Sequence, residues 1–172
     1  MCGLVGTFFA RSRSPEELEG VAARMAGTIV HRGPDDSGTW SDAMGRLTLG
    51  FRRLSILDLS SAGHQPMRSA SGRYTVVFNG ELYNHLELRR ELAGAGPFRG
   101  RADTETLLAG FERWGIAATV GRIAGMFAIA VWDAERQALS LARDRFGKKP
   151  LYVYRAPGVL GFASELRAFR QL

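Results

Sequence analysis

Apolar and polar residues follow two periods along this chain, one typical of β-strands and one typical of α-helices. Short runs rich in Val, Leu and Phe predict strands, and several runs come in pairs separated by a few turn residues. The predicted strands lie within residues 3–9, 46–57, 72–85, 125–133, 138–144, 150–154 and 159–164. Within 72–85 we expect the strand to break at Gly80, before a helix begins.

Helical spacing is clearest after Ser14, where a capping box and a proline at the first helical position precede the apolar positions. This pattern predicts a helix from about Pro15 to about Ile29. The polar segment 31–38, with its Gly, Pro and Asp residues, is predicted to be a loop. The other predicted helices end at Gly94, span 103–114, and start near Ser164.

The order of these elements indicates the fold class. Strands come in hairpins, and few of them could be joined by helical crossovers, so the pattern favours an α+β fold with mainly antiparallel sheets. A length of 172 residues suits a single domain covering positions 1–172.

Composition narrows the class of protein further. The formal net charge is +6, but the arginines are scattered, so we expect a solvated basic surface and no nucleic-acid partner. A basic face turned toward a partner domain is the alternative. No apolar run reaches the ~18 residues of a membrane span, and the N-terminus lacks the pattern of a signal peptide. We therefore expect a cytoplasmic protein with no membrane partner.

Cys2 is the only cysteine, and it follows the initiator methionine directly. A single cysteine excludes an internal disulfide and a multi-cysteine metal site, and we expect no metal. Removal of Met1 would place a thiol and an α-amine on one residue. The amine, with an ordinary pKa of about 7.7–8.0, could then act as a base toward the thiol. Taken alone, however, a cysteine here is more often a small buried apolar residue.

Three other segments carry candidate chemistry. Asn79 and Gly80 could offer a side-chain NH2 and a backbone N–H to a developing oxyanion, although such a pair is also common in turns. An arginine in the segment 52–58 could hold an anionic ligand, although a lone arginine is more often part of a surface ion pair. Asp103 precedes a predicted helix, where a capping role is the simpler interpretation.

Seven segments occur in the order seen in class II glutamine amidotransferases: MCGLVG, HRGPDDSG, RRLSILDLS, FNGELYNH, DTE, GMFAIAVWD and RDRFGKKPLY. The resemblance covers about residues 2–170 and is closest to the N-terminal glutaminase domain of glutamine-hydrolysing asparagine synthetase. It implies a four-layer αββα sandwich of the N-terminal nucleophile hydrolase type. It also implies hydrolysis of L-glutamine to L-glutamate and ammonia through a γ-glutamyl thioester on the cysteine.

The same resemblance implies a role for each site residue. Cys2 resembles the nucleophile, and Asn79 with the Gly80 N–H resembles the oxyanion hole. Arg53 resembles the residue that holds the glutamine α-carboxylate, a role that suits the planar guanidinium fork. The other implied site residues are Leu54, Ser55, Ile56 and Leu57 along the pocket, Glu81 and Asp103 at the α-ammonium, and Arg32 behind the site.

The resembled enzymes continue into an ATP-dependent synthetase domain that receives the ammonia, and the SGGxDS-type loop of that domain is absent from this sequence. The resemblance therefore implies no cofactor here, with ATP and Mg only in a synthetase domain or subunit. That domain and L-glutamine are the expected partners, and a homodimer is compatible with the pattern. Two alternatives stay open: a non-catalytic regulatory or interaction module on the same fold, and a fragment of a synthetase with another acceptor.

Overall fold

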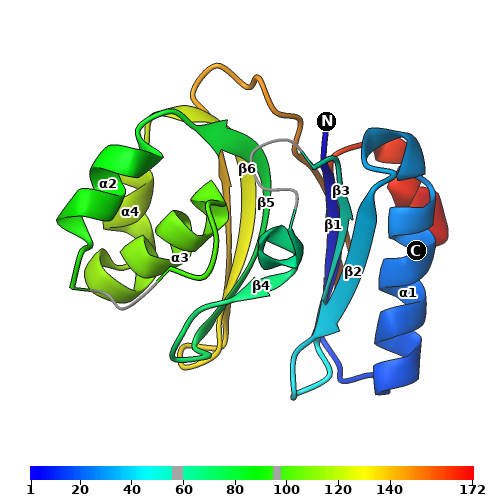
Figure 1. Cartoon of the computed structure of the whole chain (residues 1–172). Helices are drawn as coiled ribbons and strands as arrows, with labels where there is room; N and C mark the ends of the chain where they lie inside the picture. Colours follow the sequence, from blue (N-terminus) through cyan, green and yellow to red (C-terminus); the bar gives the residue numbers. More distant parts are fainter. Residues whose placement is uncertain (56–59, 95–97) are drawn as a thin grey trace. The chain divides into compact units, whose positions relative to one another are not determined.

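The computed structural model describes residues 1–55, 60–94 and 98–172, and its chain forms two compact units. Residues 1–55 and 150–172 make the first unit, and residues 56–149 make the second. Each unit consists of one antiparallel sheet with helices against one of its faces (Figure 1). The predicted α+β class with mainly antiparallel sheets is therefore confirmed.

The first unit has a five-stranded sheet in the order β2-β3-β1-β9-β8. Its elements are β1 (Gly3–Phe9), α1 (Pro15–Gly27), η1 (Val30–Arg32), β2 (Asp36–Ser41), β3 (Leu47–Arg53), β8 (Tyr152–Ala156), β9 (Val159–Ala163) and η3 (Leu166–Gln171), where η denotes a 3-10 helix. The central strand β1 pairs with β3 on one side and with β9 on the other. Because both pairings are antiparallel, the start of β1 lies beside the ends of β3 and β9.

The helix α1 begins as the sequence predicts and ends slightly earlier. The Ser14 hydroxyl accepts a hydrogen bond from the Glu17 N–H at 3.2 Å, and the Glu17 carboxylate accepts one from the Ser14 N–H at 2.9 Å. The helix packs on the sheet around a small apolar core, which comprises Val5, Met25, Ala26, Ile29, Ala163 and Ala168. The helix ends at Gly27, and η1 follows, overlapping the first two residues of the segment 31–38 that was predicted as a loop.

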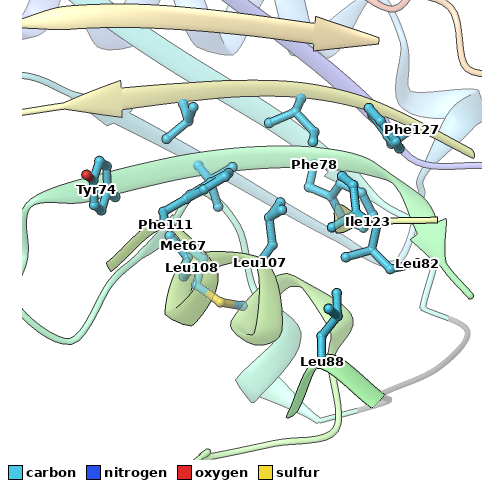
Figure 2. Close-up of a cluster of buried hydrophobic side chains, with 13 residues drawn as sticks. Met67, Tyr74, Phe78, Leu82, Leu88, Leu107, Leu108, Phe111, Ile123 and Phe127 are labelled. Atoms are coloured by element: carbon cyan, nitrogen blue, oxygen red, sulfur yellow. The ribbon is translucent and has the colours of Figure 1, made fainter. Parts of the chain in front are cut away.

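The second unit has a four-stranded sheet in the order β4-β5-β6-β7. Its elements are η2 (Ser61–Gly63), β4 (Met67–Arg68), β5 (Tyr74–Leu82), α2 (His85–Glu91), α3 (Asp103–Trp114), α4 (Ile116–Arg122), β6 (Gly125–Asp133) and β7 (Ala138–Arg143). Figure 2 shows the core of this unit, where side chains of α3 such as Leu107 and Phe111 pack with those of β5 and β6. This packing fixes the N-terminus of α3 relative to the sheet.

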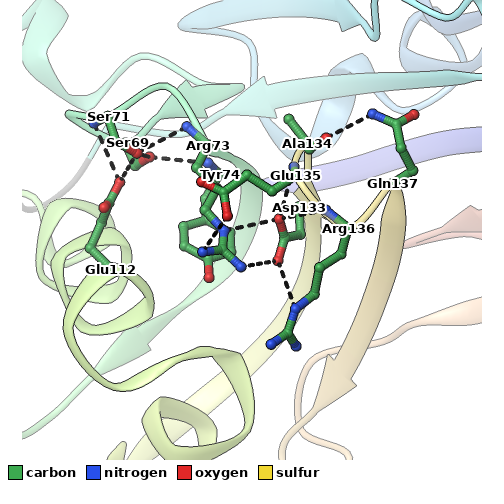
Figure 3. A network of polar contacts seen from close by, with 10 residues as sticks. All are labelled: Ser69, Ser71, Arg73, Tyr74, Glu112, Asp133, Ala134, Glu135, Arg136 and Gln137. Atoms are coloured by element: carbon green, nitrogen blue, oxygen red, sulfur yellow. Dashed lines mark hydrogen bonds and ion pairs between the residues drawn. The ribbon is translucent and has the colours of Figure 1, made fainter.

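A polar network holds the start of β5 against the hairpin between β6 and β7 (Figure 3). The Arg73 guanidinium donates to both carboxylate oxygens of Asp133, from Nε at 3.0 Å and from NH2 at 2.8 Å. Asp133 also accepts the N–H groups of Glu135 and Arg136 in the turn. Burial acts to raise the pKa of the Asp133 carboxyl, but these donors hold that pKa below its ordinary value.

The predicted hairpins within 125–144 and 150–164 are confirmed, whereas the break at Gly80 is wrong. Strand β5 continues through Gly80 to Leu82, and Gly80 pairs with Phe127 of β6. A Cβ on Gly80 would collide with the Met126 carbonyl oxygen, so the glycine permits close strand contact instead of a turn. The sequence analysis also missed β2, a short strand rich in Gly, Ser and Thr, and α4, a helix of only seven residues.

Candidate active site

In the first unit, the start of β1 and the end of β3 place Cys2 beside Leu54. Gly3 of β1 pairs with Arg52 of β3. Cys2, just before β1, therefore lies close to Leu54, just after β3, although 52 positions separate Cys2 and Leu54 in sequence. The Cys2 Sγ accepts a hydrogen bond from the Leu54 N–H at 3.3 Å and lies 3.5 Å from the Leu54 carbonyl oxygen, to which the thiol donates. The thiol of the candidate nucleophile is thus held by backbone groups and is partly exposed.

Arg32 contacts the backbone of the same residue. Its Nε donates to the Cys2 carbonyl oxygen at 3.0 Å, and its NH1 donates to Glu165 at 3.2 Å. The structure therefore brings Arg32 to the candidate nucleophile, as the resemblance implies. Glu165 is a residue that the sequence analysis missed. Glu165 lies in the segment FASEL, whose first two residues, Phe162 and Ala163, end the strand β9 that pairs with β1.

Asp35, a second residue that the sequence analysis missed, forms hydrogen bonds with the backbone at the end of β3. The Asp35 N–H donates to the Arg53 carbonyl oxygen at 3.1 Å, and the Asp35 carboxylate accepts the Ser55 N–H at 2.8 Å. Gly33 lies so close that a Cβ there would come within 2.5 Å of the backbone between Arg52 and Arg53. This explains why the predicted loop 31–38 carries a glycine before its acidic residues.

Four residues were assigned along the pocket, and the structure describes two of them. Leu54 contacts the Cys2 thiol through its backbone, and Ser55 is bound by Asp35. Ile56 and Leu57 lie outside the described residues. Arg53, the last residue of β3, is buried in the first unit.

In the second unit, Asn79, Gly80 and Glu81 lie in the last part of β5. Asn79 is 1% exposed, and its side-chain nitrogen has no hydrogen-bond partner among the described residues. A buried donor without a partner costs free energy, so such groups often serve a ligand or a reaction. This supports the oxyanion role for the Asn79 side chain. Glu81 is less buried than Asn79 and keeps part of its surface exposed.

Asp103 lies beside the end of this strand. It is the first residue of α3, and its carboxylate accepts the Leu82 N–H at 2.9 Å. The capping interpretation is wrong, because the capping position is Ala102 and its side chain makes no capping hydrogen bond. Burial raises the pKa of the Asp103 carboxyl above its ordinary value, although the Leu82 N–H and nearby His85 act to lower it.

Neither a metal centre nor a membrane span is found in the part of the chain that the structure describes. There, no group of three or more His, Cys, Asp and Glu side chains could hold a metal ion. No helix in the same residues is long and apolar enough to cross a bilayer.

Two solved structures define the class of fold. The glutamine phosphoribosylpyrophosphate amidotransferase of Bacillus subtilis, complexed with ADP and GMP, matches 98% of this chain with a TM-score of 0.82 and 20% identity, over 43% of its own length. An allosteric regulatory enzyme of purine biosynthesis matches 99% of this chain with a TM-score of 0.80, also at 20% identity and over 43% of its length. This likeness shows that the chain shares its fold with these two enzymes.

The sequence places the protein more narrowly. Residues 1–172 match the family described as "Glutamine amidotransferase domain", and the chain belongs to that family. Glutamine-hydrolysing asparagine synthetase 1 of Bacillus subtilis is 41% identical over 98% of this chain, and amidase chry2 of Gibberella zeae is 37% identical over 98%. The chain spans 26% of the length of each of these two relatives. It is therefore similar to one part of them.

Proposed function

We propose that this domain hydrolyses L-glutamine through Cys2 and supplies the ammonia to an ATP-dependent amidation of the asparagine synthetase type. The observation that carries the proposal is the position of the Cys2 thiol, held by the Leu54 backbone and flanked by Arg32 in a member of the glutamine amidotransferase family. Incubation with glutamine, followed by measurement of glutamate and ammonia, tests the first half. No release from correctly processed, folded protein contradicts it.

The reaction uses two groups on one residue. After removal of Met1, the α-amine of Cys2 takes the thiol proton, directly or through a water molecule, and the sulfur attacks the side-chain carbonyl carbon of glutamine. The Asn79 side chain and the Gly80 N–H donate to the resulting oxyanion. The tetrahedral intermediate expels ammonia, which carries away the proton held by the amine, and leaves a γ-glutamyl thioester. Attack by water then releases glutamate and restores the thiol.

The α-carbon of glutamine carries a carboxylate and an ammonium group, so its recognition needs one cation and one or two anions. We propose that Arg53 binds the α-carboxylate of glutamine and that Glu81 and Asp103 bind its α-ammonium group. Glutamate carries the same two groups, and its rejection falls to the oxyanion donors and the uncharged surroundings of the amide.

Substitution of Arg53 by lysine is expected to raise the KM for glutamine about tenfold or more, with little change in kcat. Lysine keeps the charge but loses the two parallel N–H donors that fit a carboxylate. Steady-state kinetics with glutamine measure the effect, and Arg52→Lys on the same strand is the matched control. An unchanged KM in the Arg53 variant contradicts the assignment.

Substitution of Asp103 by asparagine is expected to raise the KM about 10–100-fold, which corresponds to the loss of one charge-assisted hydrogen bond. Because burial raises the pKa of Asp103, the carboxylate takes up a proton at a higher pH than an ordinary aspartate. As the pH is lowered, the wild-type kcat/KM should therefore begin to fall at a pH above the ordinary pKa of aspartate. The Asp103→Asn variant should not show this fall.

Stability provides the control for the Asp103 variant. A carboxyl whose pKa is raised by folding stabilises the protein most at low pH, and this contribution is lost as the pH rises. Asparagine also keeps an oxygen that can accept the Leu82 N–H, so Asp103→Asn should not lower the melting temperature at neutral pH. The substrate role would be contradicted if Asp103→Asn lowered the melting temperature and still showed the wild-type fall of kcat/KM at acidic pH.

The acceptor of the ammonia is the second half of the proposal. Similarity to asparagine synthetase 1 supports aspartate as the acceptor, with ATP and Mg bound by a synthetase domain or subunit and no cofactor in this domain. Similarity to amidase chry2 favours a different acceptor as the second candidate. Co-purification of the partner, followed by ATP-dependent amidation of aspartate with glutamine as the nitrogen source, distinguishes the two.

We propose that a loop within the segment RDRFGKKPLY forms part of the surface that contacts the synthetase partner. The Asp144 carboxylate accepts four backbone N–H groups, those of Phe127, Phe146, Lys148 and Lys149. Arg143 donates to two carbonyl oxygens of the same loop. This ordered loop leaves the Phe146 side chain 89% exposed, and exposed aromatic residues on rigid loops are frequent anchors of protein interfaces.

A further inference from the structure

Glu165 follows the strand that pairs with β1, and this brings it to the start of β1. The pairing extends past β9, because the Ser164 N–H donates to the Leu4 carbonyl oxygen at 2.8 Å and the Ser164 hydroxyl accepts the Leu4 N–H at 3.0 Å. The residue after Ser164 therefore lies close to the beginning of the chain. Its position is set by strand pairing across 160 positions of sequence.

The Glu165 carboxylate contacts three basic side chains. Its Oε1 accepts hydrogen bonds from Arg32 NH1 at 3.2 Å and from His31 Nε2 at 2.8 Å, and its Oε2 lies 3.0 Å from Arg167 Nε. The side chain of Arg32 is 10% exposed, whereas those of His31 and Arg167 are 52% and 57% exposed. Arg32 is thus the buried partner, and the other two lie toward solvent.

The buried Arg32 guanidinium needs this carboxylate. A buried cation is costly unless an anion and hydrogen-bond acceptors compensate it. Among the described residues its NH2 group has no partner, so the Cys2 carbonyl and Glu165 account for its described hydrogen bonds. Burial acts to raise the pKa of Glu165, but His31, Arg32 and Arg167 hold that pKa below its ordinary value, and the carboxylate is ionised at neutral pH.

We propose that Glu165 is a positioning residue for the nucleophile: it holds the Arg32 guanidinium so that Nε fixes the Cys2 carbonyl and, with it, the thiol. This inference rests on the proposed role of Cys2. Among the described residues, the hydrogen bonds and ion pairs given for Glu165 involve neither the thiol nor a residue assigned to the substrate. Its effect on catalysis passes through Arg32.

Loss of the carboxylate should therefore lower kcat more than it changes KM. A small displacement of a reacting group can cost about 100-fold in rate, so Glu165→Ala is expected to lower kcat about 10–100-fold. The KM should stay within about threefold, because the residues assigned to the α-carboxylate and ammonium are untouched. Glu165→Gln keeps an oxygen that can accept from Arg32, and its kcat should lie between those of the wild type and of Glu165→Ala.

A double-mutant cycle tests whether the effect passes through Arg32. If it does, Glu165→Ala should have no further effect on kcat in an Arg32→Ala background, so the two losses are not additive. Additive losses, or full kcat in Glu165→Ala, overturn the inference. Arg167→Ala is the matched control: it removes an exposed partner of the same carboxylate and should retain the wild-type kcat.

A second readout needs no turnover. Because Cys2 is the only thiol, its alkylation by iodoacetamide can be followed by intact mass without glutamine. The alkylation rate should change in both single variants, stay as in the wild type in Arg167→Ala, and change no further in the double variant. An unchanged rate in Glu165→Ala overturns the inference. If the wild type releases no glutamate, the proposed function fails, while this cycle still decides the positioning role.

Discussion

Substitution of Cys2 by alanine is expected to abolish the release of glutamate from glutamine. The proposed reaction requires a covalent bond to this sulfur, and the chain has no second thiol to replace it. The structure indicates that this loss of activity will come from the missing nucleophile and not from unfolding of the protein. The thiol is partly exposed and its hydrogen bonds are with the Leu54 backbone, so alanine should leave the fold intact. Kinetics and a thermal melt on the same preparation measure both.

Cys2→Ser is the matched variant for this experiment. The hydroxyl can keep hydrogen bonds with the Leu54 backbone but is a weaker nucleophile than a thiol, so turnover should fall steeply with an unchanged melting temperature. Glutamine hydrolysis that survives in Cys2→Ala would contradict the assigned nucleophile.

The same assignment makes activity depend on Met1. While Met1 is attached, the Cys2 nitrogen belongs to a peptide bond and cannot act as a base. Intact mass should therefore show an active preparation lacking Met1, and a variant that retains a residue before Cys2 should be inactive.

Substitution of Asn79 by alanine is expected to lower kcat about 10²–10³-fold, the usual effect of removing one oxyanion donor. The Asn79 side-chain nitrogen is buried and has no partner among the described residues. Its removal should therefore lose no hydrogen bond of that nitrogen in the resting protein, and kcat should fall while the KM stays nearly constant. Glutamate formation under saturating glutamine measures the effect.

Asn79→Asp provides the control, because it has nearly the same shape but replaces the donor by an acceptor. Its kcat should fall at least as far as that of Asn79→Ala. If Asn79→Ala retains full turnover, the oxyanion assignment is wrong, and the unpaired nitrogen needs another explanation.

The local pattern was sufficient for most elements. The capping box at Ser14 and the helical spacing after it predicted where α1 begins, because both depend on contacts within a few residues. The paired apolar runs predicted the β6-β7 and β8-β9 hairpins for the same reason. The motifs also selected Cys2 and Asn79 as candidate site residues, and their roles stay predictions.

Other features depended on contacts between distant segments. Gly80 resembles a turn residue in sequence, yet it lies within β5, because the close approach of the Met126 carbonyl requires a residue without Cβ. Asp103 resembles a helix cap, but packing of α3 places its carboxylate against the Leu82 N–H.

What the sequence by itself determined is the fold class, the family and the candidate nucleophile, since these follow from short motifs and local periodicity. Only the tertiary structure showed how Cys2 is held: by the Leu54 backbone and by Arg32, which Glu165 holds in turn. The physical reason is that antiparallel pairing of β1 with β3 and β9 brings these residues together, and strand register between distant segments has no local signal.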